Sequence, residues 1–106
     1  MHTNHLELAS FAALSCQSLQ SIKSTDTGQP TQIQFRNSTV QIVQLFWVDY
    51  EGKEKFYFQL PPNQFETFDT YVEHPWIVRD LTGTCLDVFV PEKTSPILAE
   101  IAARVQ

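Results

Sequence analysis

The residues from 70 to 76 bring together side chains that could do chemistry. Thr70, His74 and Trp76 place a hydroxyl, an imidazole and an indole within one short stretch. His2 and His5 lie in the expected N-terminal tail, so His74 is the histidine expected inside the folded domain. A threonine and a histidine could form a nucleophile and its base, but no orienting acid stands at a recognisable spacing and no oxyanion motif accompanies them.

A metal site is not expected either. A single histidine without paired cysteines cannot hold a metal ion unless distant carboxylates join it. A lone histidine near a turn is more often a structural hydrogen-bonding group. We therefore expect no catalytic residue, no metal ion and no cofactor, and the protein is not expected to be an enzyme.

Aromatic residues are the second unusual feature. The chain has eight Phe, three Tyr and two Trp, and all but one of them lie between Phe35 and Phe89. A domain this small does not need all of these rings for its core. Some of them are therefore candidates for a binding surface.

Composition limits the classes of function. A chain of 106 residues makes one domain, and 42% hydrophobic with 18% charged residues can bury a core. No apolar run approaches the roughly 18 residues of a membrane span. The net charge is -5 without a basic cluster, so a nucleic acid is not an expected partner. Three glycines in no phosphate-binding motif argue against a nucleotide site.

The two cysteines give an open prediction. Cys16 and Cys85 are 69 positions apart and match no zinc or redox spacing. They can form a disulfide only if the fold brings them together, and buried free thiols in a reducing compartment are the default. The N-terminus lacks a basic region, and Glu7 interrupts its short apolar run, so it does not resemble a signal peptide. The cytoplasm is the predicted location.

The N-terminal segment differs from the rest of the chain. Residues 6–14 are rich in Ala and Leu, and Leu8, Phe11 and Ala12 share one helical stripe. This pattern predicts a short amphipathic helix within residues 1–18. A β-domain over residues 19–106 would follow it.

After a loop at residues 24–30, the hydrophobic period changes to two. Alternating or β-branched runs predict strands at about 32–35, 40–50, 55–60, 65–72, 75–79 and 85–90, with a turn at Thr82-Gly83. This is the pattern of a mainly β fold, an antiparallel β-sandwich. Residues 97–105 alternate as a strand but also fit a helix, and a strand is slightly favoured.

One turn allows the faces of a hairpin to be assigned. The sequence from Asp49 to Lys53, with Gly52 between them, suits a three-residue loop with glycine in the left-handed conformation. Residue 49 then pairs with residue 53, which places Trp47 opposite Lys55. The predicted core face is listed here in full: Phe46, Val48, Tyr50, Phe56, Phe58 and Leu60.

The other face of this hairpin is the candidate binding face. Its members alternate with the core residues: Leu45, Trp47, Asp49, Lys53, Lys55, Tyr57 and Gln59. Trp47 and Tyr57 are diagonal neighbours within reach of each other. Periodicity by itself favours a simpler explanation, in which these two rings cover the lysine side chains or pack under the N-terminal helix.

A resemblance to a known family favours the binding explanation. From about Gln32 to Pro91 the chain resembles the β-domain family of the von Hippel–Lindau tumour suppressor and its bacterial relatives. The matching motifs are Phe35-x-Asn37, Trp47 followed by Glu51-Gly52, Tyr57, Leu60-Pro61-Pro62, Tyr71-x-x-His74-x-Trp76, Arg79-Asp80 and Val88-Phe89-Val90-Pro91.

The resemblance implies a binding site for peptides that carry 4-hydroxyproline. It makes Trp47, Tyr57 and Trp76 the aromatic walls around the proline ring. It makes Thr70 and His74 the hydrogen-bonding partners of the ring hydroxyl. Tyr57 would also hold a peptide carbonyl with its phenol, and Tyr71 would line the edge of the pocket.

Three departures from the family qualify this expectation. Thr70 replaces the family's serine, and Asp69 stands where the tumour suppressor has a histidine that touches the peptide. The tumour suppressor also continues into a helical domain that docks elongin C and so recruits a cullin ligase. We expect no such domain in this chain, where residues 97–105 better resemble the last strand of the sandwich.

The sequence therefore predicts a non-catalytic recognition module for hydroxyproline-containing peptides or proteins. The alternative is a structural or interaction domain whose aromatic groove binds an unmodified Pro-rich segment or a partner protein. The two differ in whether Trp47, Tyr57 and Trp76 converge around an open pocket.

Overall fold

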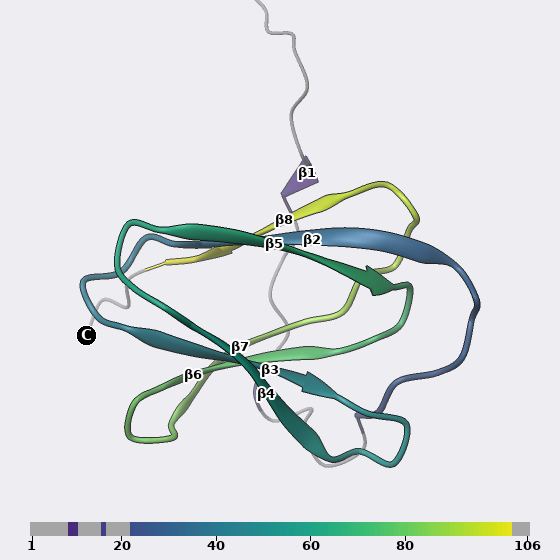
Figure 1. Ribbon diagram of the computed structural model, residues 1–106, viewed down its shortest axis with the longest axis horizontal. Helices are drawn as coiled ribbons and strands as arrows, with labels where there is room; N and C mark the ends of the chain where they lie inside the picture. The colour runs from purple at the N-terminus through teal and green to yellow at the C-terminus, as the bar shows by residue number, and fades with distance from the viewer. Residues whose placement is uncertain (1–8, 11–15, 17–21, 103–106) are drawn as a thin grey trace, which may run out of the picture.

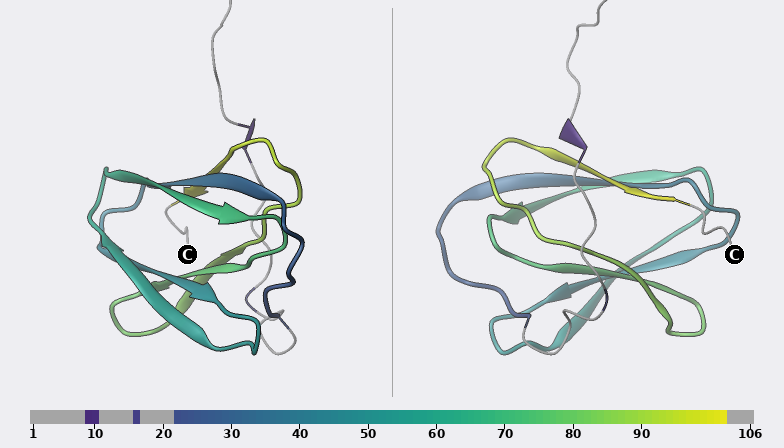
Figure 2. Two further views of the ribbon diagram at one scale, coloured as in Figure 1. Left: turned by 45° about the vertical axis from the view of Figure 1, so that its right-hand side comes forward. Right: turned by 180° about the vertical axis from the view of Figure 1, so that it is seen from behind.

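The protein is a sandwich of two β-sheets. The computed structural model describes residues 9–10, 16 and 22–102. Figures 1 and 2 show two layers of strands that face each other. Sheet order is β1-β8-β2-β5 in one layer and β4-β3-β6-β7 in the other. The strands are β1 (Ala9–Ser10), β2 (Pro30–Asn37), β3 (Val43–Val48), β4 (Glu54–Leu60), β5 (Phe65–Tyr71), β6 (Trp76–Asp80), β7 (Cys85–Phe89) and β8 (Ile97–Ile101). The predicted mainly β sandwich is confirmed.

The first sheet is mixed, whereas the sequence predicted an antiparallel sandwich. β2 pairs antiparallel with β5, but β8 lies parallel to β2 and to β1. The chain crosses the whole second sheet between β2 and β8, and so it can re-enter the first sheet in the same direction. Residues 97–101 form a strand, as the alternation favoured, with Ile97, Ala99 and Ile101 buried.

The N-terminal helix was predicted within residues 1–18. At residues 9 and 10 the structure has the short strand β1, so the prediction is wrong there. A segment this short gains more from pairing with the edge of β8 than from one helical turn, since helix nucleation is unfavourable. The other residues of the predicted helix lie outside the described ones, apart from Cys16.

The predicted turn between β3 and β4 is confirmed. The Asp49 and Lys53 backbones pair, with the Asp49 N–H 2.8 Å from the Lys53 oxygen, and the Gly52 N–H donates to the Asp49 oxygen. Gly52 has a φ of 83°, the left-handed conformation that the bulge requires. The Asp49 carboxylate accepts from the N–H groups of Glu51 and Lys53. The pair Trp47–Lys55 follows, as predicted.

Beyond the next pair, Phe46–Phe56, the register shifts. The predicted core face is right for Phe58 and Leu60, which belong to the main core, and wrong for Phe46, Val48, Tyr50 and Phe56. A β-bulge lies between Leu45 and Phe46, so Leu45 pairs with Phe58 and not with Tyr57. The extra residue in β4 reverses the alternation, which turns Phe58 toward the core and leaves Phe56 56% exposed.

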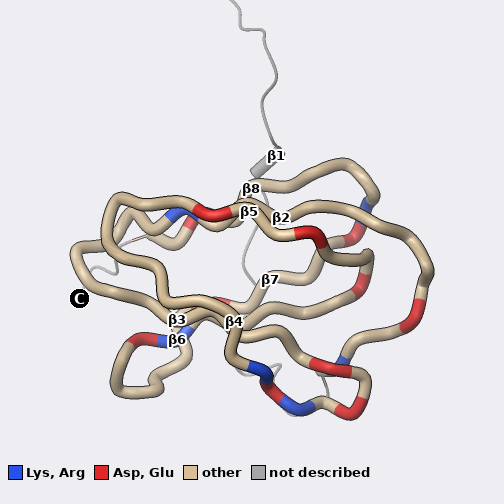
Figure 3. Tube along the Cα trace, in the orientation of Figure 1, with Lys and Arg blue, Asp and Glu red and all other residues tan. Residues whose placement is uncertain are grey.

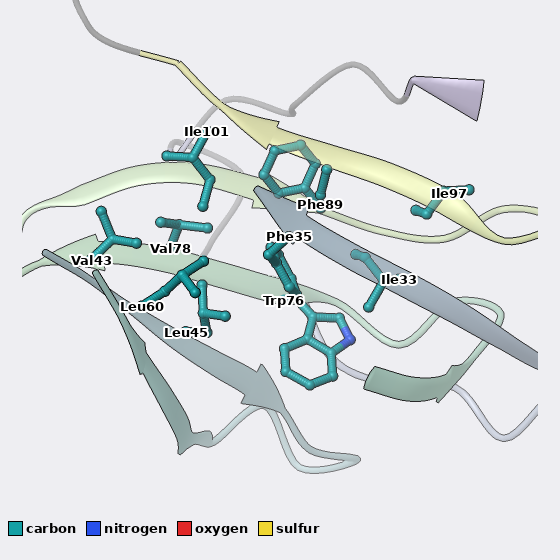
Figure 4. Close-up of a cluster of buried hydrophobic side chains, with 11 residues drawn as sticks. Ile33, Phe35, Val43, Leu45, Leu60, Trp76, Val78, Phe89, Ile97 and Ile101 are labelled. Carbon is teal, nitrogen blue, oxygen red and sulfur yellow. The ribbon is translucent and has the colours of Figure 1, made fainter. Parts of the chain in front are cut away.

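The core lies between the sheets, and in β3 it lies on the face that the sequence assigned to ligand binding. Leu45 is fully buried there, and Trp47 packs against the same cluster. Figure 4 shows the buried side chains, with Trp76 next to Phe35. The cluster consists of Ile33, Phe35, Val43, Leu45, Leu60, Trp76, Val78, Phe89, Ile97, Ala99 and Ile101. Trp47 and Trp76, two of the predicted binding residues, thus lie on the inner faces of their strands, in or against the core.

The outer face of the second sheet carries a smaller apolar cluster. Val48, Ile77 and Val88 are buried in it, and Cys16 and Ile22 pack against them. Val48 and Phe46 were predicted to face the main core, but they lie in this outer cluster, which Cys16 and Ile22 partly cover.

Cys16 and Cys85 form a disulfide, so the prediction of free thiols is wrong. The spacing of 69 residues gave no signal, because only the tertiary structure places Cys16 beside Cys85 at the start of β7. The bond holds Cys16 at the outer face of the second sheet, away from the side on which Trp47 lies.

Charged residues of both signs are interspersed on the surface. Figure 3 shows acidic and basic positions alternating along the turn between β3 and β4. In the described part of the chain, no helix is long and apolar enough to cross a membrane. Within the same residues, no group of three histidine, cysteine or carboxylate side chains lies close enough to hold a metal ion.

Candidate functional site

The structure brings all six predicted site residues together around one pocket. Its volume is about 240 Å³. The residues that line it are Trp47, Tyr50, Tyr57, Asp69, Thr70, Tyr71, His74 and Trp76. The three aromatic residues whose convergence distinguishes the two explanations of the sequence therefore share one cavity.

Both sheets contribute to the pocket. Trp47 lies near the end of β3 and Tyr57 in the bulged strand β4, while Thr70 and Tyr71 end β5 in the other sheet. Trp76 begins β6. The pocket thus lies between β4 and β5, which are edge strands of their sheets.

A tight turn between β5 and β6 carries the imidazole. The His74 N–H donates to the Tyr71 oxygen, and Glu73 has a φ of 67°, which is uncommon outside glycine. The Glu73 N–H donates to the Pro91 oxygen, and the Val48 N–H donates to the Pro75 oxygen. These bonds to neighbouring elements hold the turn in a strained conformation and fix His74 beside the end of β3.

The loop at residues 24–30 supports the same region. The Ser24 hydroxyl donates to the Val48 oxygen at 2.6 Å, and the Thr27 hydroxyl donates to the Val72 oxygen. The sequence predicted only a loop here. The structure shows that it connects the end of β3 to the turn that carries His74.

Trp76 and Thr70 form the inner end of the pocket. The indole of Trp76 is 1% exposed and stacks on Phe68 with ring centroids 5.4 Å apart. Its N–H donates to the Thr70 hydroxyl at 3.1 Å, and Thr70 is 5% exposed. A hydroxyl has two lone pairs and one proton, so Thr70 keeps the capacity to bind a further polar group.

His74 is the second buried polar group, with 4% of its surface exposed. The Trp47 indole N–H donates to its Nδ1 at 3.3 Å, and the Tyr50 hydroxyl lies 3.3 Å from its Nε2. Burial lowers the pKa of His74 below the usual 6.5, because it disfavours the charged ring, while the Asp26 carboxylate and the Thr25 carbonyl act in the opposite direction. The imidazole is therefore neutral at pH 7.

The remaining walls are rings with exposed edges. Tyr57 is 49% exposed and meets Trp76 edge to face with centroids 4.8 Å apart. Tyr71 is 44% exposed and tilts against His74 at 5.3 Å. Both phenols are thus accessible to a molecule in the pocket.

Tyr50 is the lining residue that the sequence analysis placed incorrectly. Its position in the alternation assigned it to the core face, but it belongs to the turn and is 49% exposed. Its proximity to His74 is a tertiary contact over 24 positions, for which the sequence offered no signal. Asp69 also lines the pocket, and its carboxylate accepts a hydrogen bond from the Gln32 amide at 2.9 Å.

A comparison with protein-family models identifies the family of the chain. The model of the VHL beta domain matches residues 22–93, which is more than half of the chain. The chain belongs to the VHL β-domain family. The VHL β-domain is a non-catalytic recognition domain that binds protein or peptide partners. The match begins upstream of the motifs noticed in the sequence and includes the loop that supports the His74 turn.

Proposed function

We propose that this VHL β-domain recognises peptides or proteins that contain 4-hydroxyproline, without catalysis. The observation that supports the proposal most directly is the pocket itself. It combines flat aromatic walls, formed by Trp47, Tyr57 and Trp76, with two buried polar groups, Thr70 and His74. An apolar ring with one hydroxyl matches this combination.

The ring and the hydroxyl would contribute separately. A pyrrolidine ring is rigid and apolar, so aromatic walls bury it with little loss of conformational entropy. A hydroxyl that enters such a pocket must find a partner. Thr70 and His74 are more than nine-tenths buried and supply those partners. An unmodified proline would offer the Thr70 hydroxyl no such partner, and a buried polar group that lacks a partner costs roughly 1–3 kcal/mol.

Residues on either side of the hydroxyproline would meet a different rim from that of the tumour suppressor. Asp69 and the half-exposed Tyr71 separate the pocket from a second hollow of about 370 Å³ beside β2. An acidic side chain stands at the position where the family resemblance places a histidine that touches the peptide. We therefore expect flanking preferences of its own for this domain.

The test is calorimetric titration with two synthetic peptides. Both are capped heptapeptides with a central proline in an alanine and glycine context, and only one is 4-hydroxylated. We expect the hydroxylated peptide to bind at least about fivefold more tightly, as one net hydrogen bond of roughly 1 kcal/mol implies. Equal binding would support the alternative of an unmodified Pro-rich ligand. No binding of either peptide would contradict the proposal.

The compartment is a separate question. The sequence predicts the cytoplasm, because the N-terminus does not resemble a signal peptide. Disulfides persist in oxidising compartments and are rare in the cytosol. We therefore propose that the Cys16–Cys85 bond forms in an oxidising compartment, in place of the predicted cytoplasm. Alkylation of the thiols in intact cells, followed by mass spectrometry, tests this; two alkylated cysteines would contradict it.

A further inference from the structure

Tyr50 stands beside the imidazole of His74. Its ring meets His74 at 88° with centroids 5.3 Å apart, and it meets Trp47 at 86° and 6.1 Å. The turn that carries it is rigid, because the Asp49 carboxylate accepts two backbone N–H groups within it and Gly52 takes the left-handed conformation. The phenol hydroxyl reaches to 3.3 Å from His74 Nε2.

The neighbours of the neutral imidazole determine which nitrogen carries its proton. The indole N–H of Trp47 can only donate, and it points at Nδ1 from 3.3 Å. Nδ1 must therefore accept, so the proton is on Nε2. Nε2–H in turn needs an acceptor. The Tyr50 hydroxyl oxygen, 3.3 Å away, supplies one.

Thr70 defines the other half of the polar pair. Its oxygen already accepts the Trp76 N–H, which leaves one lone pair and one proton for a ligand. A ligand hydroxyl between the two residues can accept from His74 Nε2–H and donate to the Thr70 oxygen. The first of these two bonds uses the Nε2–H group that is hydrogen-bonded to the Tyr50 hydroxyl in the free protein.

We propose that Tyr50 is a specificity-determining residue, whose hydroxyl takes the place of the ligand hydroxyl at His74 Nε2 until the ligand displaces it. This inference rests on the proposed function, since it concerns the same pocket. It has a consequence for selectivity. With an unmodified proline in the pocket, Tyr50 still satisfies Nε2–H, so the penalty for the missing ligand hydroxyl is smaller than it would otherwise be.

The binding test compares the wild type with Tyr50→Phe, which keeps the ring and removes the hydroxyl. The ratio of the two dissociation constants, plain over hydroxylated, is measured with the heptapeptide pair described above. We expect this ratio to rise about threefold in Tyr50→Phe, a value at the lower end for one hydrogen bond because the contact of 3.3 Å is long. An unchanged or smaller ratio would overturn the proposal.

A second measurement does not depend on any peptide. The nitrogen chemical shifts of His74 in the free, ¹⁵N-labelled protein report which ring nitrogen is protonated. We expect the Nε2–H tautomer in the wild type and a shifted Nε2 resonance in Tyr50→Phe. Tyr71→Phe is the control, because Tyr71 contacts the imidazole with its ring, whereas the hydroxyl at Nε2 belongs to Tyr50. This variant should leave the Nε2 resonance in place.

The two measurements separate the possible failures. If the wild-type protein does not prefer the hydroxylated peptide but the Nε2 resonance responds to Tyr50→Phe, the proposed function fails and the Tyr50–His74 contact stands. If the peptide preference is present but neither the ratio nor the resonance changes, the role of Tyr50 is overturned and the proposed function stands. An Nδ1–H tautomer in the wild type would also overturn it.

Discussion

The indole N–H of Trp76 donates to the hydroxyl of Thr70 in the interior of the protein, at 3.1 Å. This bond joins the last residues of β5 to the first residue of β6, although the two strands belong to different sheets. The proposed ligand-binding hydroxyl is therefore also a structural one. Substitutions at Thr70 must change stability as well as selectivity.

Thr70→Val should affect both properties. The substitution keeps the shape of the side chain but removes the acceptor of the Trp76 N–H, which leaves a buried donor unpaired at a cost of roughly 1–3 kcal/mol. It should also reduce the preference for the hydroxylated peptide. Urea unfolding measures the first effect and calorimetric titration the second.

Two further variants make the Thr70 experiment specific. Thr70→Ser restores the hydroxyl and should recover most of the stability and the selectivity. Thr67→Val removes an exposed hydroxyl from the same strand and should change neither stability nor selectivity. The Gln34 amide, which donates to this hydroxyl, can donate to water instead. A Thr70→Val protein as stable and as selective as the wild type would contradict the assigned role.

Phe56 and Phe58 form a matched pair that tests the bulge. Phe58 packs against the main core, while Phe56 is 56% exposed and contacts Phe46 on the outer face. Phe58→Ala should cost about 3 kcal/mol, and Phe56→Ala less than about 1 kcal/mol. Chemical denaturation of both variants gives the comparison. Equal losses would indicate that the alternation continues without the bulge.

The free energy of unfolding should decrease as the pH is lowered, because His74 becomes protonated. Burial lowers the folded-state pKa below the ordinary value of 6.5, so at acidic pH the unfolded chain binds more protons than the folded one. The stabilisation that neutral His74 gives to the folded state is complete above about pH 6.5, and it is lost as pH falls from there toward the lowered pKa. Binding should weaken in the same range, because protonation places a second N–H on Nδ1, opposite the Trp47 donor.

Denaturation and titration between pH 5 and 8 check the His74 prediction, with His74→Gln as the reference. The lower limit of roughly pH 5 avoids the titration of the Asp49 and Asp80 carboxyl groups. Backbone N–H groups lower the pKa of Asp49 below 3.8, and the Thr82 hydroxyl together with backbone N–H groups does the same for Asp80. The variant should show a flatter stability profile than the wild type. Parallel profiles would exclude His74 as the group that titrates.

Reduction of the Cys16–Cys85 bond should destabilise the fold. The bond closes a loop of 69 residues, for which loss of chain entropy in the unfolded state predicts about 4 kcal/mol, with about 2 kcal/mol as a lower value. Thermal unfolding with and without reductant measures this. The protein with both cysteines changed to alanine should melt at the lower temperature under both conditions. Identical melting temperatures of the oxidised and reduced wild type would show that the disulfide does not stabilise the fold.

The sequence by itself determined the class of fold and most of the site. Alternating apolar residues placed six of the strands, and the Asp and Gly positions defined the β3–β4 turn, because both signals are local. The spacing of Trp47, Tyr57, His74 and Trp76 led to the family and, through it, to the residues that share the pocket.

Only the tertiary structure decided which face of the hairpin is buried. The bulge at Leu45/Phe46 inserts one residue into β4, and a period-two pattern cannot locate such an insertion. The disulfide, the parallel partner of β2 and the contact of Tyr50 with His74 are likewise decided by packing between segments distant in the chain. Local propensity contains no information about these contacts, because they depend on how the two sheets and the N-terminal segment come together.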